Sequence, residues 1–128
     1  MRMWMIEPHL LCRQHLLGEH YELHMLVGSL RKGRRIDGYL LRRFIDPSSI
    51  YARHEVLEKE LRTRGGNPQS PLNKKECEAF AEWYGATTID PGESMSALSS
   101  RCDACRDRIG SFVRVMLTRA VQPSFIPW

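Results

Sequence analysis

The feature that most constrains the fold is an apolar periodicity running from residue 10 to residue 30. At about 100° per residue, these apolar side chains fall on two helical stripes. The first stripe is Cys12, Leu16, Leu23, Val27 and Leu30, and the second is Leu10, Leu17, Tyr21 and Met25. Proline is favoured in the first turn of a helix, and glycine often ends one. We therefore expect a helix that begins near Pro8, ends at Arg31 or Lys32 just before Gly33, and is buried on two sides.

Polar side chains lie between the two stripes. One strip is basic and favours solvent or phosphate: Arg13, His20, His24 and Arg31. The opposite sector, about 60° wide, holds His15, Glu19 and Glu22 between apolar flanks. It is either a second solvent face with an ordinary His15–Glu19 pair, or a recessed cluster whose pKa values are shifted into a useful range.

The boundaries of the later helices are predicted from residues that typically cap or end a helix. Asp46 or Ser48 is a candidate cap for a second helix of about residues 49 to 64. Asn73, with Glu76 three residues on, resembles a capping box for a short helix that Gly85 closes.

A last helix is expected from about Glu93 to Ile109, while residues 111 to 121 suit either strand or helix. The prediction is therefore a mainly α protein, a single compact domain over residues 1 to 128 with about four helices and long connecting loops. A length of 128 residues agrees with one domain.

The chain carries a net charge of +4 and has a pI near 9.1, which favours an anionic partner. No window approaches the roughly 18 apolar residues of a membrane span, and the N-terminus lacks a secretory apolar segment. We expect a cytoplasmic protein without a membrane partner.

The four cysteines favour reduced thiols over a disulfide framework, because no export signal is visible. Cys102 and Cys105 form a single C-x-x-C, and a structural zinc site would need two further ligands from elsewhere in the chain. Buried helical thiols, without metal or cofactor, are the main expectation, and a zinc or redox site is the alternative.

The polar positions of QHLLGEHYEL (residues 14 to 23), followed by VGSLRKG (residues 27 to 33), are scattered in a way that helix amphipathicity does not dictate. This stretch resembles the phage-type pyrimidine-dimer DNA glycosylase/AP lyase family, whose helix pattern is Q-H-L-x-x-E-x-x-E-L, followed by a Gly, a hydrophobe and Arg-Lys. The likeness is good over about the first quarter of the chain. It is looser in ELRTRG (residues 60 to 65) and in the helix after IDPGES.

The resemblance implies a nucleophile at the mature N-terminus and a glutamate beside it. In this register they are the α-amine of Met1 and the carboxylate of Glu22, and the bulky Arg2 predicts that Met1 is retained. Free α-amines have pKa values of about 7.7 to 8.0, so near pH 7 a substantial fraction of such amines is neutral and can act as a nucleophile. The implied activity is glycosidic bond cleavage through an imine, followed by β-elimination at the abasic site.

The resemblance also implies residues that hold the nucleic acid by its phosphates or orient the sugar. They are Arg2, Gln14, His15, Arg31 and Lys32. The partner would be double-stranded DNA with damaged or abasic sites, bound by a monomer. Glu19 matches a family glutamate for which a structural role is expected.

Two departures bear on specificity. Tyr21 and Met25 stand where the family has arginines that grip DNA, which leaves the lesion preference open. For Tyr21, packing in the core is the expectation and stacking on a base is the alternative. The C-terminal PSFIPW faintly resembles the family's aromatic tail, so Phe125 and Trp128 are candidate DNA contacts. An arginine of the last helix is expected near the site, with three candidates: Arg101, Arg106 and Arg108.

Three functions follow in order of preference. The first is a repair enzyme that flips a nucleotide, cleaves its glycosidic bond and nicks the strand. The second is a basic helical DNA-binding protein that keeps the scaffold without catalysis. The third is a metal or redox protein built on the C-x-x-C.

Overall fold

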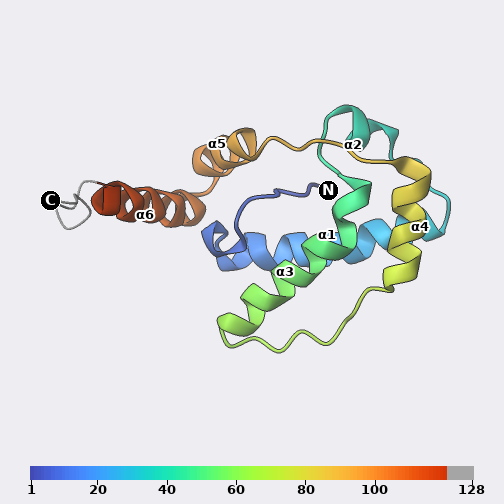
Figure 1. The fold of residues 1–128 in the computed structure, drawn as a ribbon, viewed down its shortest axis with the longest axis horizontal. Helices are drawn as coiled ribbons and strands as arrows, with labels where there is room; N and C mark the ends of the chain where they lie inside the picture. The colour runs from blue at the N-terminus through green and yellow to red at the C-terminus, as the bar shows by residue number, and fades with distance from the viewer. Residues whose placement is uncertain (121–128) are drawn as a thin grey trace, which may run out of the picture.

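The computed structural model describes residues 1–120, and helices dominate it (Figure 1). No strand occurs in these residues, so the predicted mainly α class is confirmed. Its elements, with η marking 3-10 helices, are η1 (Pro8–Leu10), α1 (Arg13–Arg31), α2 (Asp37–Leu41), η2 (Pro47–Ser49), α3 (Ile50–Thr63), α4 (Lys74–Tyr84), α5 (Pro91–Arg101) and α6 (Asp103–Ala120).

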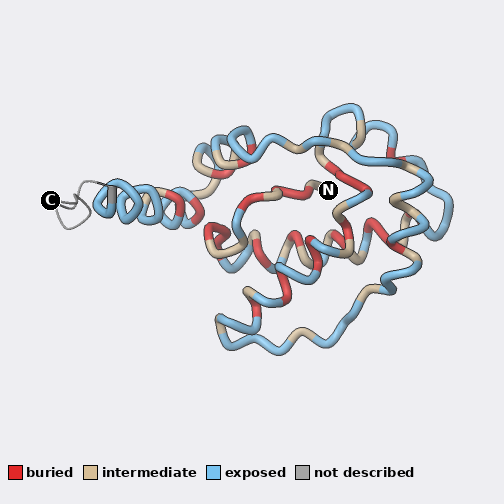
Figure 2. Tube along the Cα trace, viewed as in Figure 1, coloured by how far each residue is buried: buried red, intermediate tan, exposed pale blue. Residues whose placement is uncertain are grey.

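The centre of the molecule is the crossing of α1 and α3, over which the extended N-terminal segment runs (Figure 1). α4 packs on η2 and α3 at one end, while α5 and α6 lie at the other, where α6 contacts η1. Buried residues concentrate along α1, α3 and the N-terminal segment, and the outer part of α6 is exposed (Figure 2). None of the helices within residues 1–120 has the length and apolar character needed to cross a bilayer.

The first long helix begins at Arg13, so the predicted start near Pro8 is wrong. Pro8 opens the short η1, and the backbone is then extended at Leu11 and at Cys12, where ψ is 166°. The Cys12 sulfur accepts the His15 N–H and caps α1. The predicted stop is confirmed, since Gly33 has a φ of 71°.

Only one of the two predicted apolar stripes of α1 is buried. The stripe from Leu16 to Leu30 is confirmed, but Leu17, Tyr21 and Met25 are 39%, 66% and 48% exposed. The core packing expected for Tyr21 is therefore wrong. Helical periodicity gives the angle between residues but does not tell which sector a neighbouring segment covers.

The polar sector of α1 is the one turned inward, because α3 supplies a partner for its charge. Glu19 is 1% exposed, and Arg53 of α3 donates to its two oxygens at 2.5 and 3.0 Å. A third donor of the same guanidinium reaches the Ile6 carbonyl at 2.6 Å. One buried ion pair thus joins α1, α3 and the N-terminal segment, which gives Glu19 the structural role expected of it.

Two histidines of the predicted basic strip also face α3. His20 stacks on His54 with ring centroids 4.7 Å apart, and the Nε2 atoms of His24 and His54 are 3.0 Å apart. Burial lowers the pKa of all three imidazoles, and Glu58 opposes that shift in part. The strip is therefore only partly exposed to solvent at His20 and His24.

The cap predicted for α4 is confirmed, because Asn73 accepts from the Glu76 N–H. The cap predicted for α3 is wrong: Ser49 holds the cap position without a side-chain hydrogen bond, and Asp46 instead accepts from the Ser48 N–H at the start of η2, which leads into α3. The reciprocal half of the capping box is absent, since the Glu76 carboxylate bonds Arg31 instead.

The predicted last helix is two helices, because the backbone is extended at Cys102, where φ is −132° and ψ is 112°. Of the two alternatives for residues 111 to 120, helix is the observed one. The short α2 falls in a segment for which no helix was predicted.

The central ion pair supports a stability prediction. Arg53→Met leaves the Glu19 carboxylate buried without a partner, so we expect the free energy of unfolding to fall by about 3–5 kcal/mol. Urea denaturation at neutral pH measures it. Arg35→Met, which removes an exposed pair with Asp37, is the control and should change little. Equal losses in the two variants would contradict a structural role for the pair.

The histidine cluster predicts a pH dependence. Because the folded-state pKa values of His20, His24 and His54 lie below the ordinary 6.5, the unfolded chain binds protons that the folded cluster does not. The contribution of the neutral cluster to the free energy of unfolding is therefore complete above pH 6.5 and is lost as the pH falls below that value. Urea titrations at about pH 7.5 and about pH 5.5 should show this loss, and His24→Gln should reduce it. His9→Gln, outside the cluster, should not.

Candidate functional site

A cavity of about 510 Å³ lies between the N-terminal segment, α1 and the chain around residues 39 to 44. It brings together five residues that the sequence predicted for the site: Met1, Arg2, Gln14, His15 and Glu22. The other lining residues are Trp4, Gly18, Glu19, Tyr39, Arg42, Phe44 and Arg101. The predicted residues Arg31 and Lys32 do not line it.

The N-terminal segment is fixed against the chain that follows α2. The Met3 N–H donates to the Phe44 carbonyl at 2.7 Å, and the buried Met3 sulfur accepts the Asp46 N–H at 3.4 Å. Met3 and Trp4 are 1% and 8% exposed, so both anchor the segment in the core. The residues before them are therefore held over α1.

Glu22 contacts this segment directly. The Arg2 N–H donates to Glu22 Oε2 at 3.2 Å. Because one residue spans about 3.8 Å, the Met1 amine lies within roughly one residue length of that hydrogen bond. A carboxylate and the start of the chain thus share one cavity.

The Arg2 side chain is clamped by two aromatic rings. Its guanidinium carbon lies 4.4 Å from the ring centroids of both Trp4 and Phe44, a cation–π arrangement on two sides. Burial, and then repulsion from Arg101, lowers the pKa of the Arg2 guanidinium. Its Nε atom is buried without a hydrogen-bond partner among residues 1–120.

The charge balance of the cavity favours an anionic ligand. Arg2, Arg42 and Arg101 line it together with two carboxylates, of which Glu19 is already paired with Arg53. Phosphate groups suit such arginines because guanidinium donors match their oxygens.

Arg101 is the one of the three candidate C-terminal arginines that reaches the cavity. Arg106 instead bonds the Asp103 carboxylate, and Arg108 donates to the His9 carbonyl at 2.8 Å.

The basic pair at the end of α1 lies outside the cavity. Arg31 donates to both oxygens of Glu76 at 2.8 and 2.6 Å, and Lys32 is exposed. Contacts of this pair with DNA would be made away from the cavity. Phe125 and Trp128, the predicted aromatic contacts, lie outside the described residues.

Sequence reasoning missed the aromatic and basic wall formed by Trp4, Tyr39, Arg42 and Phe44. Its shape depends on a turn after α2 in which the Phe44 N–H bonds the Tyr39 carbonyl at 2.9 Å and Arg43 has a φ of 56°. Glycine or asparagine at that position would have signalled the turn, but arginine does not.

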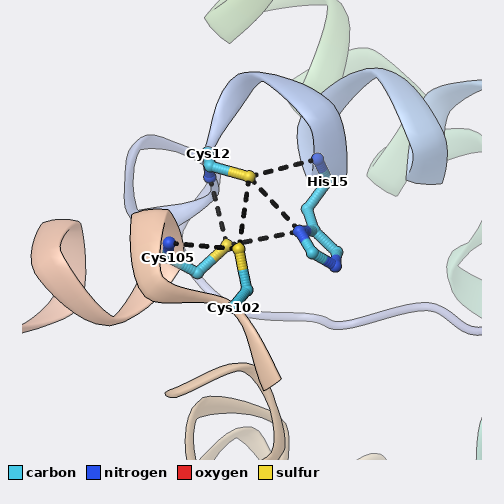
Figure 3. A group of neighbouring side chains, drawn as sticks. All are labelled: Cys12, His15, Cys102 and Cys105. Carbon is cyan, nitrogen blue, oxygen red and sulfur yellow. Dashed lines mark hydrogen bonds between the residues drawn. The ribbon is translucent and has the colours of Figure 1, made fainter. Parts of the chain in front are cut away.

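Beside the cavity, side chains that bind metals gather at the start of α1. Cys12, His15, Cys102 and Cys105 place their ligand atoms within 4.8 Å of one another (Figure 3). Burial raises the pKa of the Cys105 thiol to about 12, so without a cation nearby this thiol stays protonated. The imidazoles of His20, His24 and His54 form a second such group.

In a comparison with protein-family models, the model described as pyrimidine dimer DNA glycosylase matches residues 1–74. The matched part is more than half of the chain and includes every cavity residue except Arg101. Comparisons with curated proteins and with solved structures gave no match.

Proposed function

Because the chain belongs to the pyrimidine dimer DNA glycosylase family, we propose that it cleaves the glycosidic bond of a damaged nucleotide and then nicks the strand as an AP lyase. The observation that carries this proposal is the hydrogen bond from the Arg2 N–H to Glu22 inside a cavity that Met1 lines. It brings an amine and a carboxylate to the same small space.

In the first step, the neutral Met1 amine attacks the anomeric carbon of the deoxyribose. The bond from that carbon to the base breaks, the base leaves with the bonding electrons, and loss of a proton from nitrogen and opening of the ring give a protonated imine. The Glu22 carboxylate would stabilise the cationic intermediate, because it borders the same cavity as Met1 and carries the opposite charge.

In the second step, the protonated imine acidifies the protons at C2′. Glu22 would remove one of them, the electron pair would form a C2′–C3′ double bond, and the C3′–O bond would break with the phosphate as the leaving group. Hydrolysis of the imine would then release the sugar and regenerate the amine.

Arg2 and Arg101 are suited to hold the phosphates that flank the flipped nucleotide. The rings of Trp4 and Phe44 fix the Arg2 guanidinium in place, which reduces the entropy lost when it binds a phosphate. His15 and Gln14, which line the same cavity, would orient the sugar.

Lesion preference would depend on the outward side of α1. Tyr21 and Met25 share a helix face with Gly18 and Glu22 of the cavity and are exposed. They offer a ring for stacking and an apolar side chain where the resemblance leads us to expect arginines. We propose that contact with the bases, more than ion pairing with phosphates, sets selectivity there.

The catalytic proposal is tested with Glu22→Gln. On a duplex with an abasic site, we expect strand nicking to slow by about 10²–10⁴-fold, because the proton acceptor is lost. Borohydride should still trap a covalent adduct there, since imine formation needs only the amine. Glu82→Gln, an exposed acid on α4, is the control and should nick normally.

Wild-type protein that binds irradiated and abasic duplexes but yields neither adduct nor nick would overturn the proposal. That outcome would identify the alternative, a non-catalytic basic helical DNA-binding protein.

The role of Arg101 is tested by the salt dependence of binding. Arg101→Gln should weaken binding to abasic duplex and reduce the slope of log affinity against log salt by about 1, because one phosphate contact is lost. Arg106→Gln, whose arginine bonds Asp103 outside the cavity, is the matched control and should leave the slope nearly unchanged. Equal slopes for the two variants would show that Arg101 does not contact a DNA phosphate.

A further inference from the structure

We propose that Cys12, His15, Cys102 and Cys105 form a structural zinc site that joins the start of α1 to the junction of α5 and α6. This proposal does not rest on the proposed enzymatic function. The sequence led us to expect no metal, because the C-x-x-C supplies only two ligands. The fold adds the other two, Cys12 and His15, which lie 90 residues earlier in the chain than Cys102 and Cys105.

The four residues have the chemistry of a closed zinc site. Three thiols and an imidazole form a Cys3His set, and each half has a two-residue spacing, Cys12 to His15 and Cys102 to Cys105. Each pair sits at a helix start, where the chain turns and both side chains can face one point. Two short turns therefore hold all four ligands.

The distances between ligand atoms fit a single tetrahedral ion. Bonds of about 2.3 Å to sulfur and about 2.0 Å to nitrogen imply edges of about 3.8 Å between sulfurs and about 3.5 Å between sulfur and nitrogen. The Cys12 and Cys102 sulfurs are 3.8 Å apart, and His15 Nδ1 lies 3.2 Å from the Cys12 sulfur and 3.5 Å from the Cys105 sulfur. Figure 3 shows the sulfurs and Nδ1 converging, with the other ring nitrogen turned away.

Each sulfur also accepts one backbone N–H, as thiolates bound to a metal commonly do. The Cys12 N–H donates to the Cys105 sulfur at 3.3 Å, the Cys105 N–H to the Cys102 sulfur at 3.4 Å, and the His15 N–H to the Cys12 sulfur at 3.5 Å. These donors would offset part of the negative charge of a three-thiolate site. The backbone N–H groups therefore lie where they would stabilise thiolate sulfurs.

Zinc is the metal that this set favours. A thiolate-rich tetrahedral site selects zinc over hard cations that need oxygen ligands. Ligand atoms within 4.8 Å of one another surround one ion and leave no room for a cluster of several metals.

The site would position residues of the neighbouring cavity. Arg101, which lines the cavity, directly precedes the ligand Cys102, and His15 belongs to both the cavity and the metal cluster. Coordination through Nδ1 would fix the second ring nitrogen of His15 as an N–H donor. The metal would therefore hold α5, outside the family-matched residues 1–74, against the part of the chain inside them.

Metal content measured by mass spectrometry tests the proposal. Protein produced with zinc present and purified under reducing conditions should carry about one zinc per chain. Cys102→Ser and Cys105→Ser should lose most of it. Cys77→Ser, which removes a buried cysteine on α4 outside the cluster, is the matched control and should keep it.

Wild-type protein provides a second measurement in case the variants fail to fold. Cobalt added to metal-free protein should give the intense visible absorption of a tetrahedral thiolate site, and zinc should abolish it. Mercurial titration of the thiols should release the zinc.

Absence of zinc together with absence of that cobalt spectrum in the wild-type protein would overturn the site. Loss of zinc from Cys77→Ser to the same extent as from Cys102→Ser would also contradict it. A disulfide between Cys102 and Cys105 in protein purified without reductant, with no bound zinc, would replace it with a redox pair.

Discussion

The arrangement of this protein depends on one buried ion pair. Arg53 of α3 uses three donors on two acceptors, the Glu19 carboxylate of α1 and the Ile6 carbonyl of the N-terminal segment. A buried charge without a partner is costly. The three segments must therefore be placed so that Arg53 reaches both of its acceptors at once. The crossing of α1 with α3 and the path of the first residues over α1 are thereby fixed together.

The same pair explains why a polar face of α1 is turned inward. With Glu19 satisfied from α3, Glu22 one turn later borders the cavity and meets the Arg2 N–H. The N-terminal segment is anchored behind it by the buried Met3 and Trp4. A buried, paired carboxylate and a carboxylate at the edge of the cavity thus stand on one helix, three residues apart.

Sequence reasoning succeeded where the signal was local and failed where a distant segment decided the outcome. The Asn73 cap, the Gly33 stop and the helical class follow from nearby residues. Tyr21 was misplaced because a helical wheel does not reveal that α3 brings an arginine to the opposite side. The convergence of Cys12 with Cys105 depends on a helix break at Cys102 that no glycine or proline marks.

The most direct measurement is to locate the sugar on the protein. An adduct trapped by borohydride on abasic duplex, digested with protease and nuclease, is sequenced by tandem mass spectrometry. We expect the reduced deoxyribose fragment on the α-nitrogen of Met1, the residue beside the Arg2–Glu22 hydrogen bond. A fragment on a lysine side chain, or on no residue at all, would contradict the central claim that the N-terminal amine and Glu22 form the reactive centre.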